Sequence, residues 1–468
     1  MAEIQWCHVA GMLSYGRFRL ATTRSALNQQ TEGNLKAPQI IARSAHPVSR
    51  ANISDNALKV LNRLHRAGYQ AFLVGGAVRD LLVGHEPKDF DVATDARPED
   101  IRELFRNCRL IGRRFRLAHV HFGREIIEVA TFRGDSTDGI ETDAAGRILR
   151  DNIYGAIEHD VWRRDFTANA LYYNIADFSI WDYTGGIKDI ESGVLRMIGD
   201  AEARYREDPV RMLRAVRFSA KLGFNLHADT KRPLTELAPI IADVPPARLF
   251  DEILKLFLTG HAQSSFDLLS RHELLQYLFP ATVDCAQLSG AASFRQLLNL
   301  ALENTDARCA VNKPVTPVFL FAVFLWGPIT QRVAAIRNNN HGAVFWLHRA
   351  TDEILGEQQA HVSIPRRLGA PMREIVCLQT RFAKRSGKRA LALLEHPRFR
   401  AAYDLMLLRV KAGEEDPELA TFWTDIQTMS PEQQAIAVNV SPGAGPRRRR
   451  RRGPRQRRPG PDQVPDAG

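Results

Sequence analysis

The spacing of apolar and polar positions divides the chain into a mixed first part and a helical second part. In the first part, Ser54 precedes a stripe of leucines at helical spacing that ends at Gly68, and Pro98 opens a second helix. Short apolar or alternating runs at 69–74, 108–111, 118–122 and 126–132 are typical of strands. These elements predict an α/β head with a mixed sheet covered by two or three helices, over residues 49–195.

From about residue 202 to residue 429, apolar positions recur almost entirely at helical spacing. One such stripe consists of Leu249, Ile253, Leu256 and Phe257, and Gly260 ends it. We see no fixed repeat, and we expect aromatic residues in these stripes to be core. The pattern predicts a helical neck over 196–260 and an all-α body over 261–440.

Three stretches carry no apolar periodicity. We expect residues 1–48 to be a disordered extension; the lack of acidic residues between Glu3 and Glu32 weakly resembles a targeting peptide, but a plain extension or an early start codon explains it as well. The polar, glycine-containing stretch 134–152 is expected to be a mobile loop over the site. Residues 441–468 are rich in Arg, Pro and Gly, which predicts a disordered basic tail.

The formal net charge of +11 is concentrated in that tail. It holds nine Arg and two Asp, a surplus of seven, so only four positive charges remain for the other 440 residues. Such a run can be a merely solvated tail, but guanidinium groups also bind phosphate backbones without a fold, and we favour RNA as the partner. The residues expected to contact it are Arg447, Arg448, Arg449, Arg450, Arg451 and Arg452.

Composition indicates an ordinary globular protein of a reducing compartment. The five cysteines are odd in number and lack any CxxC spacing, so neither a disulfide framework nor a zinc site is indicated. The longest apolar runs are interrupted by charges or Pro within about a dozen residues, so we expect no membrane span. A cytoplasmic location fits these observations.

The stretch from Leu73 to Thr94 is the first candidate for chemistry. An apolar run closes at Gly75 and Gly76, and Asp89 and Asp91 stand at the start of the next apolar run. On a strand these two carboxylates would point to the same face, where a divalent cation relieves their repulsion. A lone DxD is usually a solvated strand end, but the preceding glycines allow the backbone to approach a phosphate.

A second candidate is the stretch 163–174, RRDFTANALYYN. If it is helical, Asp165 and Asn169 lie one turn apart, just after Arg163 and Arg164. Such a cluster is often a surface salt bridge. The same residues would also serve as a third carboxylate beside the Asp pair, or as a contact to the sugar of a nucleotide.

A third candidate begins at Glu207 and leads into a helix. Asp208 before Pro209 is an ideal helix start that requires no ligand. However, Arg211 shares a face with Asp208, and a carboxylate beside a guanidinium fork matches the edge of adenine or cytosine and rejects guanine and uracil. The pair by itself does not choose between A and C.

These three stretches, in this order, closely resemble the class II nucleotidyltransferases, the family of bacterial poly(A) polymerases and CCA-adding enzymes. The match covers residues 50 to about 260 and implies a nucleotidyltransferase palm with a two-metal Mg²⁺ site held by Asp89 and Asp91. It implies three groups of site residues: catalytic Asp89, Asp91 and Asp165; triphosphate-binding Gly75, Gly76 and Arg79; and nucleotide-binding Arg164, Asn169, Asp208, Arg211 and Arg214.

Within that family, the stretch Leu110 to Val120 (LIGRRFRLAHV) and the Arg-rich tail look like the poly(A) polymerase branch. We therefore expect a template-independent polynucleotide adenylyltransferase that adds AMP from ATP to RNA 3′ ends, with RNA-decay proteins as further partners. A CCA-adding enzyme acting on tRNA is the alternative within the family. A non-catalytic RNA-binding protein is the alternative from another class.

Overall fold

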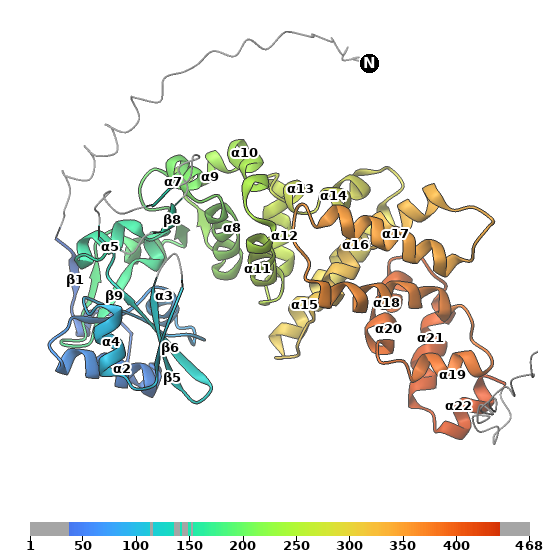
Figure 1. Ribbon diagram of the computed structural model, residues 1–468, viewed down its shortest axis with the longest axis horizontal. Helices are drawn as coiled ribbons and strands as arrows, with labels where there is room; N and C mark the ends of the chain where they lie inside the picture. The colour runs from blue at the N-terminus through green and yellow to red at the C-terminus, as the bar shows by residue number, and fades with distance from the viewer. Residues whose placement is uncertain (1–36, 113–115, 135–140, 143–147, 151–152, 440–468) are drawn as a thin grey trace, which may run out of the picture. The chain divides into compact units, whose positions relative to one another are not determined.

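The computed structural model describes residues 37–112, 116–134, 141–142, 148–150 and 153–439, and they form two compact units. The first unit ends at Ile241 and the second begins at Ala242. The first is a sheet with helices, and the second contains only helices in its described residues (Figure 1). The expected fold class, a mixed-sheet head followed by an all-α body, is confirmed.

The head is built on an eight-stranded sheet in the order β1-β10-β9-β2-β3-β6-β5-β4. Its one parallel pair is β3 with β6, and the other neighbours are antiparallel. The strands are β1 (Gln39–Ile41), β2 (Ala71–Val74), β3 (Asp91–Thr94), β4 (Cys108–Ile111), β5 (Leu117–Phe122), β6 (Glu125–Thr131), β9 (Leu171–Asn174) and β10 (Ile180–Asp182). Two small pairs lie outside it: β7 (Glu141–Thr142) with β8 (Ile148–Arg150), and β11 (Val194–Leu195) with β12 (Asn225–Leu226).

Alternation along each strand gives the sheet two different faces. In β2, Leu73 packs in a large core with α2, α3 and α4, whereas Phe72 and Val74 pack in a smaller core with α5. The helices of the head unit are α2 (Asp55–Arg66), α3 (Gly76–Leu82), α4 (Pro98–Leu104), α5 (Ile157–Arg163), α6 (Gly186–Glu191), α7 (Ala201–Glu207), α8 (Val210–Leu222), α9 (Ala228–Lys231) and α10 (Pro233–Leu237).

The predicted helix and strand ends in the head mostly agree with the structure. Ser54 caps α2 by accepting a hydrogen bond from the backbone N of Asn56, and Gly68 follows the helix with φ 92°. Pro98 begins α4, as expected. Residues 37–48 differ from the prediction of a disordered extension, because β1 pairs with β10 at the edge of the sheet.

The second unit runs through twelve α-helices in its described residues. They are α11 (Pro246–Phe257), α12 (Ala262–Arg271), α13 (Leu275–Leu278), α14 (Pro280–Gln287), α15 (Ala292–Ala310), α16 (Pro317–Ile336), α17 (Ala343–Gln358), α18 (Arg366–Phe382), α19 (Lys388–Leu394), α20 (Phe399–Lys411), α21 (Pro417–Asp425) and α22 (Pro431–Ala437). The predicted stripe from Leu249 to Phe257 is the buried side of α11. The boundary at Ile241 divides the predicted neck, because α8 belongs with the head and α11 with the body.

One helix bears on the expectation that the chain has no membrane span. Among the described residues, α16 is long and apolar enough to cross a bilayer, although Pro328 interrupts it. Of its most apolar window, 56% is buried inside the protein, and its neighbours are α14, α15, α17 and α18. Burial of this kind is typical of the central helix of a helical domain.

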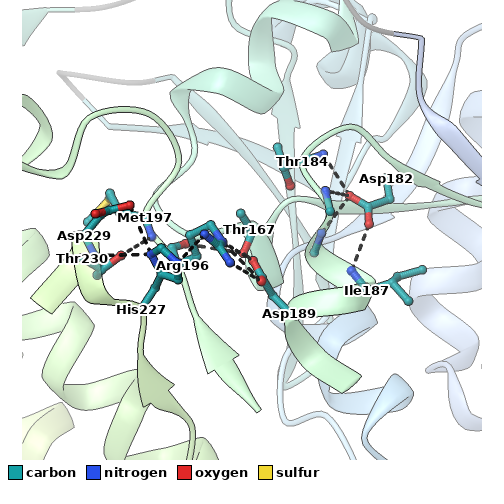
Figure 2. A network of polar contacts seen from close by, with 12 residues as sticks. Thr167, Asp182, Thr184, Ile187, Asp189, Arg196, Met197, His227, Asp229 and Thr230 are labelled. Atoms are coloured by element: carbon teal, nitrogen blue, oxygen red, sulfur yellow. Dashed lines mark hydrogen bonds and ion pairs between the residues drawn. The ribbon is translucent and has the colours of Figure 1, made fainter. Parts of the chain in front are cut away.

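A polar network holds α6, β11 and α9 together (Figure 2). Arg196 donates from Nε to Asp189 Oδ2 at 3.0 Å, and its Nη1 lies 2.7 Å from Nε2 of His227. Thr167 Oγ1 also donates to Asp189, at 2.7 Å. Next to it, Asp182 accepts hydrogen bonds from four consecutive backbone N–H groups, those of residues 184–187, and so fixes the turn into α6.

Candidate functional site

A row of polar side chains crosses three strands on the α5 side of the sheet. In the strand register, Asp91 on β3 lies opposite Glu128 on β6, and Glu128 lies opposite His119 on β5. Nε2 of His119 is 3.3 Å from Oε2 of Glu128. Sequence reasoning missed Glu128. The sequence shows there only a single acidic residue between two apolar residues, on a strand where apolar and polar residues alternate.

The carboxylates of this row crowd one another. Asp91 is open to solvent, yet its pKa is raised to about 6, because the atoms packed around the carboxyl group reduce its hydration and the charges of Glu128 and Asp89 disfavour ionisation. The charge of Arg164 partly offsets this increase. A cation bound near Asp91 would favour the ionised form of its carboxyl group.

Asp89 differs from its predicted position. The prediction placed both aspartates on one strand, but β3 begins only at Asp91, so Asp89 lies in the exposed segment before the strand. The electrostatic effect of Asp89 on Asp91 still indicates that the two carboxylates are near each other. Among the residues that the structure describes, no group of three or more His, Cys, Asp or Glu side chains is arranged to hold a metal ion.

The Gly75 turn stands beside the guanidinium of Arg164. Gly75 has φ 72°, which favours glycine, and a Cβ atom there would lie 3.7 Å from Nη1 of Arg164. The other nitrogens of Arg164 are engaged: Nε donates to the Tyr172 hydroxyl at 2.7 Å, and Nη2 donates to Oδ2 of Asp160 at 2.9 Å. A fixed positive charge therefore lies beside the glycine turn and within electrostatic reach of Asp91.

Asp160 is the buried anchor of that arginine. Burial alone would raise its pKa, but the charges of Arg164 and Arg133 lower it to about 2. Tyr172 also donates its hydroxyl to Asp160 Oδ2 at 2.6 Å. Sequence reasoning missed Asp160, although it stands four residues before Arg164 on α5.

Asp165 is held by partners other than the Asp pair. Nε of Arg214 donates to its Oδ2 at 2.8 Å, and Nδ2 of Asn169 donates to its Oδ1 at 3.2 Å. These contacts lower its pKa to about 2, although burial alone would raise it. Glu128, rather than Asp165, is thus the carboxylate in register with Asp91, and a contact to the nucleotide sugar remains the better prediction for Asp165.

Arg79 also differs from its expected place. It is 1% exposed, and both Nε and Nη2 donate to Oδ1 of Asp80, at 2.9 Å and 2.6 Å. Its Nη1 donates to Oδ1 of Asn169. The resemblance predicts that Arg79 holds a triphosphate together with Gly75 and Gly76, whereas its side chain faces the interior beneath that turn.

The third candidate stretch forms the junction of α7 and α8. Asp208 directly follows α7, and α8 begins at Val210, whose backbone N donates to Oδ1 of Asp208 at 3.3 Å. Nη1 of Arg211 donates to Oε2 of Glu207 at 2.6 Å and to the backbone O of Arg204 at 2.9 Å. Glu207, which we had not assigned a role, therefore orients the arginine predicted to read the base.

Two sets of predicted residues lie wholly or partly outside the described residues. The six tail arginines, 447–452, are among them, and so are residues 113–115 of the stretch that favoured one branch of the family. Of the predicted mobile loop at 134–152, the described parts are Gly134 and the paired strands β7 and β8.

Three protein-family models match successive parts of the chain. They are described as the poly A polymerase head domain (residues 71–196), the probable RNA and SrmB-binding site of polymerase A (residues 223–285) and the polymerase A arginine-rich C-terminus (residues 340–457).

Curated relatives are similar along most of the chain. Poly(A) polymerase I of Escherichia coli O6:H1 is 48% identical over 444 residues, covering 92% of this chain and 95% of that protein. Its counterpart from Haemophilus influenzae is 45% identical over 406 residues, 84% of this chain and 89% of that protein. A CCA-adding enzyme from Leuconostoc mesenteroides is 40% identical over only 223 residues, 48% of this chain and 54% of that protein.

Among solved structures, the Thermotoga maritima CCA-adding enzyme complexed with tRNA is similar in fold. It aligns with a TM-score of 0.55 at 19% identity and covers 83% of this chain and 85% of that chain.

Proposed function

This chain belongs to the poly(A) polymerase I family of nucleotidyltransferases, and we propose that it adds AMP from ATP to the 3′ ends of RNA without a template. The observation that carries the proposal is sequence similarity to poly(A) polymerase I over the head and the body together, whereas the sequences of CCA-adding relatives align over about half of the chain. The row from Asp91 to Glu128 supports it.

The reaction needs no covalent enzyme intermediate. The RNA 3′-hydroxyl attacks the α-phosphorus of ATP, a new phosphodiester bond forms, and pyrophosphate leaves with the bond electrons. The protein therefore contributes mainly by positioning the reactants and stabilising charge. Gly75 and Gly76 would let the triphosphate approach the backbone, and Arg164 would face it with its fixed positive charge.

Oxygen ligands for Mg²⁺ would come from Asp89, Asp91 and Glu128. When bound, Mg²⁺ supplies charge that lowers the pKa of the attacking hydroxyl and neutralises the leaving pyrophosphate. The raised pKa of Asp91 fits this role, because a bound cation removes the repulsion that disfavours its ionised form.

The remaining residues would recognise the substrates. Asp208 and Arg211 would read the base edge, with Glu207 fixing the arginine, and Asp165 with Arg214 would contact the sugar side. RNA would be held by the tail and by residues 223–285, and RNA-decay proteins are proposed as further partners. We place the enzyme in the cytoplasm.

Release of pyrophosphate tests whether the chain is an enzyme or only an RNA-binding protein. We expect release from purified full-length protein that requires ATP, RNA and Mg²⁺ together, and its loss when EDTA is added. RNA binding without any pyrophosphate release would instead support a non-catalytic protein.

A further inference from the structure

Arg79 contacts one residue of helix α8 directly, and its hydrogen-bond partners connect it to two more. Its guanidinium carbon lies 5.2 Å from the ring centroid of Phe218, within the range of a cation–π contact. Its partner Asp80 accepts a hydrogen bond from Nζ of Lys221 at 3.0 Å. These two residues of α8 are three positions apart and share one side of the helix.

A second path from Arg79 reaches α8 one turn earlier. Asn169 accepts a hydrogen bond from Arg79 and donates one to Asp165 at 3.2 Å, and Asp165 accepts from Nε of Arg214 at 2.8 Å. Arg214 precedes Phe218 by four residues, so all three points of contact fall on a single stripe of α8. Both paths begin at the buried Arg79.

The same arginine supports the glycine turn. A Cβ atom on Gly76 would lie 3.4 Å from Nη2 of Arg79, so this guanidinium lies against the first turn of α3, the helix that also carries Arg79. Helix α8, in turn, begins at Val210, two residues after Asp208, and carries Arg211 in its first turn. One side chain therefore fixes the separation between the turn expected to hold the triphosphate and the pair expected to read the base.

The distance between these two sites can distinguish adenine from cytosine, which the Asp208–Arg211 pair alone does not. Adenine and cytosine present the same order of donor and acceptor, but the purine edge lies farther from the sugar and triphosphate than the pyrimidine edge. A rigid spacing between the two ends of the nucleotide therefore separates bases by size where hydrogen bonding alone does not.

We propose that Arg79 is a positioning residue that selects adenine over cytosine by setting the distance between the Gly75–Gly76 turn and the Asp208–Arg211 pair. This inference rests on the proposed function. Arg79 acts through Asp80, Asn169 and Phe218, since a side chain that is 1% exposed does not face a bound nucleotide.

The test compares kcat/KM for ATP with kcat/KM for CTP on one unstructured RNA. This ratio is insensitive to the fraction of folded enzyme, so general damage leaves it unchanged. Arg79→Lys keeps the charge but loses the planar fork, and we expect the ratio to fall by roughly tenfold or more. Lys221→Met removes one contact at a side chain that is 39% exposed, and we expect a smaller fall in the same direction.

Arg196→Lys is the matched control, because Arg196 pairs bidentately with Asp189 in the same unit but belongs to the network of Figure 2. We expect its ratio to equal that of the wild type. An unchanged ratio in Arg79→Lys or in Lys221→Met overturns the proposal, and so does a fall of equal size in the control. A wild type that does not prefer ATP would instead contradict the proposed function itself.

Discussion

Carboxylates of the head fall into two groups with opposite electrostatics. Asp160 and Asp165 are buried against arginines, and their pKa values are lowered to about 2. Asp91 lies among other carboxylates, and its pKa is raised to about 6. Ionised carboxylates with arginine partners hold structure in place, whereas carboxylates that repel one another are available for a cation.

Glu128 gives the first prediction at the scale of single residues. Glu128→Gln keeps the shape of the side chain but removes the charge beside Asp91, and we expect turnover to fall by roughly a hundredfold or more. Turnover is measured by extension of labelled RNA at saturating ATP. Glu103→Gln, on the exposed side of α4, is the control and should retain wild-type turnover. Near wild-type activity in Glu128→Gln would exclude Glu128 from the site.

Asp165 gives a prediction for pH. Its pKa in the folded state lies below the ordinary value of 3.8, so its pair with Arg214 stabilises the head above about pH 4, and this contribution is lost as the pH falls toward 2. Asp165→Asn should reduce the free energy of opening by about 2 kcal/mol at pH 7 and by progressively less as the pH approaches 3. Hydrogen–deuterium exchange of peptides from β9 measures this free energy of opening at each pH. A difference between Asp165→Asn and the wild type that does not change with pH would contradict the lowered pKa of Asp165.

At the residue scale, the sequence predicted site residues that lie near one another in the chain and missed those that strand pairing brings together. Asp91 stands out because a second acid and two glycines lie near it in the chain. Glu128 is distant in sequence and becomes its neighbour only through the parallel pairing of β3 with β6. Arg79 is assigned to the triphosphate because its stretch resembles the phosphate-binding motif of the family, and only packing shows that it is buried.

At the scale of elements, helix caps and strand alternation predicted most of the head. Ser54, Gly68 and Pro98 mark helix ends because their backbone preferences are local. The edge strand β1 was not predicted, since its three residues have no alternation of their own and are ordered by pairing with β10. The division of the neck was missed for a similar reason, because side-chain contacts rather than sequence join α8 to the head.

Gly186 gives a prediction about how closely α6 packs against the 167–169 turn. A Cβ atom at this position would lie 2.3 Å from the backbone O of Thr167, which cannot move without displacing the 167–169 turn. Gly186→Ala should therefore destabilise the head by about 1–3 kcal/mol.

Gly290→Ala is the matched control for this substitution. No atom lies within 4 Å of the added Cβ, and its effect should stay within about 0.5 kcal/mol. Urea unfolding followed by far-UV circular dichroism measures both variants. Equal stability of the two would show that the contact between α6 and the 167–169 turn is not close-packed.

At the scale of the whole molecule, positive charge is distributed unevenly. The last 28 residues hold a surplus of seven positive charges, and the remaining 440 residues are nearly balanced. Phosphate contacts made by such a tail release counterions and are therefore sensitive to salt. A globular body of low net charge would add less of this sensitivity.

Removing residues 441–468 is expected to weaken RNA binding and to flatten its dependence on salt, with little effect on turnover at saturating RNA. Fluorescence anisotropy with a labelled RNA, between about 50 and 200 mM salt, measures both quantities. Replacing the six arginines 447–452 by glutamine at full length separates charge from length. An unchanged salt dependence in both variants would show that the tail is not an RNA contact.

The central claim is that this chain polymerises AMP on RNA. The most direct measurement incubates the purified full-length protein with an unstructured RNA, Mg²⁺ and each nucleoside triphosphate separately, and resolves the products by length. We predict long products with ATP alone and none with Asp91→Asn. Addition that requires CTP and stops after a few nucleotides would contradict the claim and identify a CCA-adding activity instead.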